Sequence, residues 1–190
     1  MRNLVRALIL SGSPRQGNSD AIAELAAKTF KELGVSVEVL KLRELQFDGC
    51  RGCRACIGVG TCVLEDDFTR MLAPKLLQTD ILVIVTPVFF DNVSHLVKKF
   101  IDRTWCLRGR LRNVVGGAIV VGRGYGLDLA IASIHSFMLK HEMILCHRGV
   151  RFRAFDVGEA MRDEAALKDL DKLIHRLVEV AQTTACMRSR

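Results

Sequence analysis

The chain has no hydrophobic run of the length that a membrane-spanning helix needs. Its longest apolar stretches, residues 81–85 and 114–121, are far shorter than the roughly 18 residues that cross a bilayer. Residues 1–10 carry two arginines but no small-residue cleavage site, so we expect no signal peptide and a cytoplasmic location. Proline is scarce, with three residues in 190, and neither repeats nor low-complexity segments are present. No linker is therefore predicted, and residues 1–190 are interpreted as a single domain.

The charge balance is basic and the cysteine content is high. Lys and Arg number 28 against 21 Asp and Glu, which gives a net charge of +7. The basic residues are scattered, without a dense run or a nucleic-acid motif, so we expect neither a nucleic acid nor a membrane as partner. The charge suits an anionic cofactor or an acidic protein. Seven cysteines without an export signal indicate a reducing compartment, where clustered cysteines more often bind metals or catalyse reactions than form disulfides.

Strand-like and helix-like segments alternate along the chain. Hydrophobic residues make up 49% of it, which suits a sheet that is buried on both faces. We predict strands at residues 4–10, 35–39, 81–85, 114–121 and 143–146. Helices are expected after each strand, with Ser19, Asp66 or Asp67, Ser94 and Asp163 placed to begin four of them, and Pro74 causing a kink or a late start. The pattern predicts an α/β fold, a doubly wound five-stranded parallel sheet with helices on both faces.

The loop after the first predicted strand is rich in hydrogen-bond donors. It offers hydroxyl, amide and guanidinium groups from Ser11, Ser13, Arg15, Asn18 and Ser19, and it leads directly into a helix N-terminus, where backbone N–H groups attract anions. It is neither a Walker A loop nor a dinucleotide-binding glycine motif. We interpret it as a phosphate cradle, and the alternative is an ordinary polar turn with a capping serine.

Three loops together resemble the FMN site of the flavodoxin-like NAD(P)H-dependent FMN reductases. The first is Ser-Gly-Ser-Pro-Arg at 11–15 followed by Asn18-Ser19, the second is Thr-Pro-Val-Phe-Phe at 86–90, and the third is the glycine loop at 122–126. The resemblance covers residues 4–126 and implies that FMN is bound by Ser11, Ser13, Arg15, Gln16, Asn18, Ser19, Thr86, Pro87, Val88, Phe89, Phe90, Gly122, Gly124 and Tyr125.

Two residues depart from that family's pattern. Phe89 stands where the family often has tyrosine, so a hydroxyl contact is lost, and Arg123 is unusual in the third loop. Pro87 fixes the chain so that backbone groups beside it can face a flat heterocycle. The alternative for Phe89 and Phe90 is that they are core or interface residues.

Four cysteines form a compact motif in the cysteine-rich loop at 46–62. Cys50, Cys53, Cys56 and Cys62 have the spacing C-x2-C-x2-C-x5-C, and glycines between them allow tight turns. Three cysteines in tandem at two-residue spacing are typical of a ferredoxin-type iron–sulfur cluster, whereas structural zinc sites usually draw on two separated pairs. We predict a cluster at these four residues and keep zinc and free or redox-switching thiols as alternatives.

This motif on an FMN-type fold resembles the iron–sulfur flavoproteins, a branch of the same superfamily. The resemblance implies a 4Fe-4S cluster, a homo-oligomer (dimer or tetramer) and a ferredoxin-like electron donor. The predicted function is electron transfer between that donor and an acceptor through FMN and the cluster, with the chemistry carried by cofactors and not by a catalytic side chain. The alternative is an NAD(P)H-dependent FMN or quinone reductase without a cluster, with NAD(P)H as the donor.

Several remaining residues receive simpler interpretations. Cys106, Cys146 and Cys186 stand apart from the motif and are expected to be buried or incidental thiols. His141 and His147 flank the fifth predicted strand, and we expect both in loops or on the surface.

Overall fold

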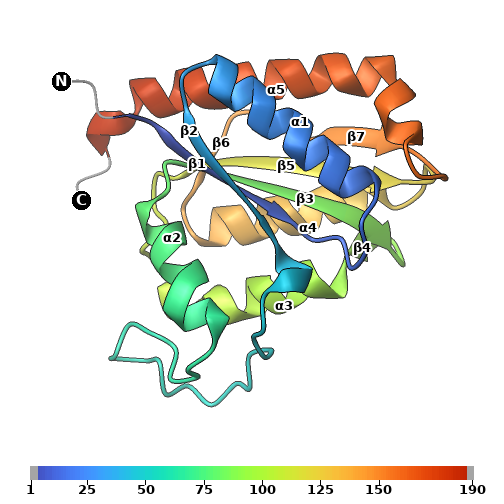
Figure 1. The fold of residues 1–190 in the computed structure, drawn as a ribbon. Helices are drawn as coiled ribbons and strands as arrows, with labels where there is room; N and C mark the ends of the chain where they lie inside the picture. The colour runs from blue at the N-terminus through green and yellow to red at the C-terminus, as the bar shows by residue number, and fades with distance from the viewer. Residues whose placement is uncertain (1–3, 188–190) are drawn as a thin grey trace.

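The computed structural model describes residues 4–187 and consists of a sheet between two layers of helices (Figure 1). The strands and α-helices are β1 Arg6–Ser11, α1 Asn18–Glu32, β2 Ser36–Lys41, α2 Ala73–Gln78, β3 Ile81–Phe89, β4 Asn92–Val93, α3 His95–Arg103, β5 Val115–Gly122, α4 Leu127–Lys140, β6 Ile144–Leu145, β7 Val150–Arg153 and α5 Glu164–Thr183. Short helical turns at Leu42–Glu44, Phe68–Leu72, Thr104–Leu107, Glu159–Arg162 and Ala185–Met187 complete the described chain.

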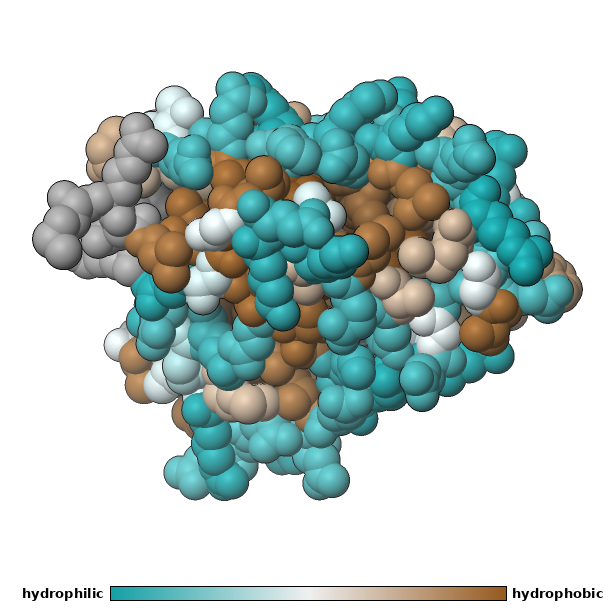
Figure 2. Space-filling model, turned by 45° about the horizontal axis from the view of Figure 1, so that its top comes forward, coloured by the Kyte–Doolittle hydropathy of each residue, from teal (hydrophilic) through white to brown (hydrophobic). Residues whose placement is uncertain are grey.

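Strand residues alternate between the two faces of the sheet, and each face has its own core. In β1, Ala7 and Ile9 pack toward α1 and α5, whereas Leu8 and Leu10 pack toward α2, α3 and α4. Figure 1 shows these two helical layers above and below the sheet. Figure 2, turned to bring the top of that view forward, shows mainly hydrophilic residues at the rim and hydrophobic ones in a band between them. Burial on both faces explains why these strands are almost entirely apolar.

The strand order confirms the predicted fold class. The parallel strands lie in the order β2-β1-β3-β5-β6, with β2 and β3 on either side of β1. This is the flavodoxin-like order, in which the chain reverses direction across the sheet between the first and third strands. Ligands of such sheets bind beyond the carboxyl ends of the strands at that point.

The edge beside β5 and the end of β3 differ from the prediction. The fifth strand, predicted at 143–146, is present as the short β6, and β7, which was not predicted, continues the parallel pairing along β5. The break between β6 and β7 lies at 146–149, where Gly149 has a φ of +88° that ends the extended conformation. In addition, β3 continues to Phe89 and turns back through β4, so the predicted loop at 86–90 belongs to a short antiparallel hairpin.

Two predicted helix caps are confirmed and one is wrong. The Ser94 side chain accepts a hydrogen bond from Val97 N, and Asp163 accepts one from Ala166 N. Ser19, by contrast, lies inside the first turn of α1 and is buried, and Gly17 is the N-cap residue. Pro74 starts α2 late, as expected, because the helix begins at Ala73 after a π-helical turn.

The phosphate-loop segment is tied to the start of α3 by a buried hydrogen-bond chain. Gly12 N donates to Val85 O at 2.8 Å, and Ser94 Oγ donates to Gly12 O at 2.6 Å. Ser94 N in turn donates to Thr86 Oγ1 at 3.1 Å. These bonds fix the loops after β1 and β3 against each other. Separately, none of the helices described within residues 4–187 is long and apolar enough to span a membrane.

Substitution of Gly12 by alanine should destabilise the protein. An added Cβ would lie 2.1 Å from Cγ2 of Val97, in a junction that has no room for it. Overpacking of this kind costs about 1–3 kcal/mol, to be measured as the free energy of unfolding in urea. Gly17→Ala is the matched control, because no atom lies within 4 Å of its added Cβ and its φ of 172° is extended. Equal stability of the two variants would contradict the tight approach.

Candidate cofactor sites

The first candidate site is a pocket of about 200 Å³ beyond the carboxyl ends of β1, β3 and β5. It is lined by parts of all three predicted FMN loops and by a fourth segment that the sequence did not point to. The lining residues are Ser13, Arg15, Gly17, Asn18, Ser19, Pro87, Val88, Phe89, Val121, Gly122, Arg123, Tyr125, Ala154, Phe155 and Val157. The structure therefore brings together residues that are up to 144 positions apart, from 13 to 157.

The donors for a phosphate in this pocket differ from those expected. Ser11 is fully buried and donates its hydroxyl to Asp20 Oδ1 at 2.6 Å, and Ser13 donates its hydroxyl to Arg15 O at 2.6 Å. No side chain caps α1 at Gly17, so the backbone N–H groups of its first turn remain directed toward the pocket. Arg15 is exposed. The helix N-terminus and Arg15 are therefore the principal groups for an anion, as helix dipoles favour.

A buried ion pair braces this loop from behind. Arg43 Nη1 lies 2.8 Å from Asp20 Oδ2, and it also donates to the carbonyls of Ser13 and Arg15 at 3.3 and 3.4 Å. This contact was not predicted, because Arg43 lies 23 residues from Asp20 on the segment after β2. The pair neutralises a buried carboxylate close to the anion site and keeps the loop carbonyls turned away.

The fourth segment closes the pocket through Asn18. Its side-chain Nδ2 donates to Asp156 O at 2.8 Å, and its Oδ1 accepts from Gly158 N at 2.7 Å. The predicted cofactor ligand Asn18 is thus a clamp on the loop at 154–158. The guanidinium of Arg123 lies 3.6 Å from the ring centroid of Phe155, a cation–π contact that accounts for this unusual residue.

Five predicted FMN ligands do not line this pocket. Ser11 and Thr86 are buried beneath it, and Gln16 lies outside its lining. Gly124 lines a neighbouring cleft. Phe90 is fully exposed, with a φ of +46°, and lines a groove of about 800 Å³ with Ile101, Leu129 and Phe137. The β3–β4 hairpin directs Phe90 away from the pocket that Phe89 lines.

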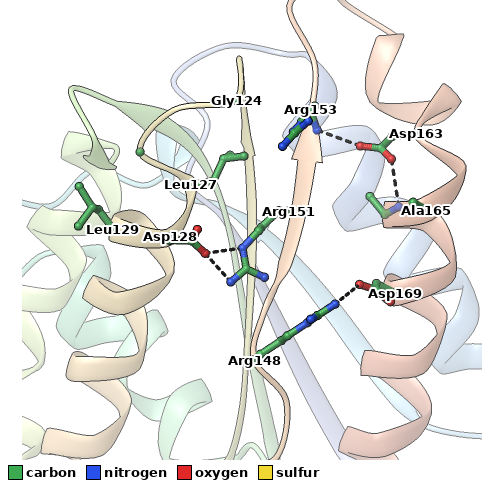
Figure 3. A pocket seen from close by; sticks show the side chains of 12 residues that line it. Gly124, Leu127, Asp128, Leu129, Arg148, Arg151, Arg153, Asp163, Ala165 and Asp169 are labelled. Carbon is green, nitrogen blue, oxygen red and sulfur yellow. Dashed lines mark hydrogen bonds and ion pairs between the residues drawn. The ribbon is translucent and has the colours of Figure 1, made fainter.

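The neighbouring cleft, about 420 Å³, lies between α4, β7 and α5 (Figure 3). Three arginines and three aspartates line it. Arg151 pairs with Asp128, and Arg148 pairs with Asp169, while Asp163 accepts from the backbone of Arg153. Hydrogen bonds from Arg148 and Lys172 lower the pKa of Asp169, so it stays ionised. Because this cleft is lined by three positive and three negative side chains, it attracts an anion less strongly than the loop at Arg15 does.

The second candidate site is a pocket of about 470 Å³ that all four motif cysteines line. This pocket belongs to residues 48–66, here called the cysteine loop, which include most of the cysteine-rich loop predicted at 46–62. The cysteine loop projects beyond the helices at the bottom of Figure 1. Cys50 and Cys53 are exposed, and Cys56 and Cys62 are half-buried. Gly52 and Gly58 have φ values of +64° and +86°, so the turns do use left-handed backbone. Within residues 4–187, no three Cys, His, Asp or Glu side chains are arranged as ligands of one ion.

A buried arginine holds the two ends of the cysteine loop. Arg103 Nη1 donates to Asp48 O at 2.7 Å and to Asp66 Oδ2 at 2.6 Å, and Nη2 donates to Asp66 Oδ1 at 3.0 Å. Burial opposes ionisation of Asp66, but the hydrogen bonds from Arg103 and from Asp48 N outweigh it and lower the pKa of Asp66. The pair is therefore ionised and bidentate, the strong geometry for arginine and carboxylate.

Cys106 and Trp105 also line this pocket, which the sequence did not indicate. Cys106 is buried, as expected, and its Sγ donates to Arg103 O at 3.3 Å. Burial, with the nearby Cys62 and Cys56, raises the pKa of Cys106 to about 11, so it remains a thiol. His141 corrects a prediction: it is buried rather than exposed, with Nε2 at 3.0 Å from Thr104 Oγ1, and burial lowers its pKa.

Comparisons with known proteins agree with this architecture. The family described as "NADPH-dependent FMN reductase" matches residues 5–156. An "Iron-sulfur flavoprotein" of Archaeoglobus fulgidus is 31% identical over 97% of this chain and 99% of its own. Another, of Methanocaldococcus jannaschii, is 32% identical over 91% of this chain and 95% of its own. The solved structure of RosB with a bound flavin phosphate intermediate has a TM-score of 0.82 at 16% identity, covering 95% of this chain and 80% of that one, a likeness of fold alone.

Replacement of Arg15 should distinguish a phosphate cradle from a polar turn. We expect Arg15→Gln to weaken FMN binding about tenfold, because a charged hydrogen bond to the phosphate is lost, and to leave riboflavin binding unchanged. The measurement is fluorescence titration of flavin-stripped protein with each flavin. Arg112→Gln is the control, since Arg112 pairs with Glu142 on the surface and lines neither pocket. An equal loss for riboflavin would contradict a phosphate contact.

Proposed function

Because the chain belongs to the NADPH-dependent FMN reductase family, and within it to the iron–sulfur flavoproteins, we propose that it transfers electrons between a ferredoxin-like donor and an acceptor through FMN and a 4Fe-4S cluster. Membership makes it an FMN-dependent oxidoreductase. When bound, the cluster supplies single-electron transfer and FMN supplies one- or two-electron chemistry. The rest of the proposal concerns what the protein's own residues do for these groups.

In the first pocket the protein binds and orients FMN. The N-terminus of α1 and Arg15 hold the phosphate. The hairpin residues Pro87–Phe89 form one wall for the ring, and the loop at 122–125 and Phe155 form the other. The Asn18 clamp holds the loop of Phe155 in place. These groups would hold and orient the flavin in the pocket.

In the second pocket Cys50, Cys53, Cys56 and Cys62 would hold the cluster. The observation that carries this proposal is that all four thiols line one pocket together with a buried N–H group, Arg103 Nε, that has no acceptor within residues 4–187. A cluster brings several sulfur atoms that accept such hydrogen bonds. The alternatives are a zinc ion bound by these cysteines or free thiols, and iron analysis distinguishes both from a cluster.

The surface around this pocket supports an acidic electron carrier as partner. Arg51, Arg54, Arg108 and Arg110 are all exposed near its mouth, and Ile57 is exposed beside them. A positive rim with an apolar centre attracts a negatively charged protein and speeds its association at low salt. A ferredoxin-like donor has that chemistry. We also propose that the protein is cytoplasmic, because its cysteines are free and its proposed donor is a ferredoxin-like protein.

A homo-oligomer, a dimer or a tetramer, is also part of the proposal. Phe90 is exposed beyond the extent usual for a large apolar side chain, and Leu129 at 59% exposure lies in the adjoining groove. Burial of these side chains between subunits would remove an apolar patch from water beside the flavin pocket.

A second candidate is favoured by the family match itself: an NAD(P)H-dependent FMN or quinone reductase without a cluster. In that case NADPH or NADH would bleach the flavin absorbance quickly in protein that contains no iron. Flavin reduction only through a reduced ferredoxin would oppose this candidate.

Replacement of one motif cysteine should remove the cluster and spare the flavin. Protein purified without oxygen should contain about four irons per chain beside FMN. Cys56→Ser should lose most of the iron and the broad absorbance near 400 nm, with its FMN content unchanged, because the two pockets share no lining residue. Cys186→Ser is the control, since Cys186 is exposed and outside the motif. Iron-free wild-type protein would refute the cluster.

Replacement of Phe90 should test the subunit contact. We expect Phe90→Ser to shift the protein toward the monomer in light scattering, because it removes the most exposed aromatic ring of the groove. Iron content should not change, since Phe90 is outside the cysteine pocket. Met187→Ser, at an exposed apolar residue outside the groove, is the control. A monomeric wild-type protein would contradict the oligomer.

A further inference from the structure

The side chain of Arg103 is the most deeply buried charge next to the cysteine pocket. It has 0% exposure, whereas its partner Asp66 has 18%. The guanidinium also lies 4.8 Å from the ring centroid of Phe68, which covers it from the core side. A charge buried this completely is costly unless each of its N–H groups finds an acceptor. What its nitrogens contact therefore indicates its role.

The two Nη atoms of Arg103 donate hydrogen bonds to both ends of the cysteine loop. Their acceptors are Asp48 O and the Asp66 carboxylate, which stand two residues before Cys50 and four residues after Cys62. Asp48 N donates to the same carboxylate at 3.2 Å, and just outside this pair Gln46 N donates to Asp67 Oδ2 at 2.6 Å. The loop is thus closed at a neck whose buried centre is Arg103.

The third nitrogen, Nε, has no such partner. It is buried and without a hydrogen-bond acceptor among the residues that the structure describes. Arg103 lines the cysteine pocket beside Cys62. A buried N–H without an acceptor destabilises the folded chain, so its retention calls for an acceptor in the pocket.

We propose that Arg103 is a positioning residue for the cluster: its Nη atoms close the neck of the cysteine loop, and its Nε–H donates to the Cys62 sulfur or to a cluster sulfide. The second part rests on the proposed cluster, whereas the closure of the neck does not. A donor held at a cluster sulfur stabilises the more negative, reduced state. Arg51 and Arg54 are exposed, and Arg51 pairs with Asp48 at 2.9 Å, so both contribute less to it.

Closure of the neck is tested on protein without a cluster, by hydrogen exchange of residues 46–66. Arg103→Gln should raise exchange of this segment while that of β1 and β5 stays unchanged. The control is Arg70→Gln, which removes an exposed arginine that contacts the carbonyl of Glu65 in the same loop. Unchanged exchange in Arg103→Gln would overturn the closure. If Arg103→Gln does not fold, Asp66→Asn is used as the test variant, because it removes the same ion pair.

The contact with sulfur is tested on anaerobically purified holoprotein with Arg103→Lys, which keeps the charge and removes Nε and the planar fork. Loss of iron to a chelator should be about 10- to 100-fold faster than in wild type, and the midpoint potential should fall. Wild-type retention and potential in this variant would overturn the contact. If wild-type protein holds no iron, the proposed function fails, while hydrogen exchange still decides the closure of the neck.

Discussion

Burial of the parallel sheet on both faces is the constraint from which the rest of the molecule follows. Because α1 and α5 cover one face and α2, α3 and α4 cover the other, the strands have no polar outer face. Polar and flexible residues are confined to strand ends. The chain leaves β1 toward one face and β3 toward the other, so the loops after them diverge and leave a crevice. The bond from Ser94 Oγ to Gly12 O holds that crevice at a fixed width.

The cysteine pocket is held by long-range hydrogen bonds and not by the sheet. It projects from the sheet, and no strand end supports it, so its geometry comes from a few long-range bonds and not from regular structure. Arg103 replaces the missing scaffold: a buried charge must keep its partners, and those partners are the two ends of the loop. A flexible segment with four thiols is thereby held as one pocket even before any cofactor is considered.

Local sequence signals predicted the fold and one part of each site. Apolar patterns identified the five strands β1, β2, β3, β5 and β6, and Ser94 and Asp163 identified helix starts, because these signals lie within a few residues of their effects. Ser19 failed as a cap because the chain enters α1 through Gly17. The Asn18 clamp spans 138 residues and the Arg103 bond to Asp66 spans 37. No local pattern encodes such pairs, so the loop at 154–158 and the role of Arg103 became visible only in three dimensions.

Helix α3 joins the two pockets mechanically. Its N-cap, Ser94, bonds to Gly12 under the flavin-side loops, and its last residue, Arg103, closes the cysteine loop. Nine residues of α-helix span about 13 Å, so this helix sets the spacing between the two regions on a short, rigid element. Val97 and Phe100 are fully buried along it, which keeps the helix from shifting against the sheet. The proposed electron transfer between groups bound in the two pockets would need a fixed separation of this kind, and the two pockets share no lining residue in the described chain.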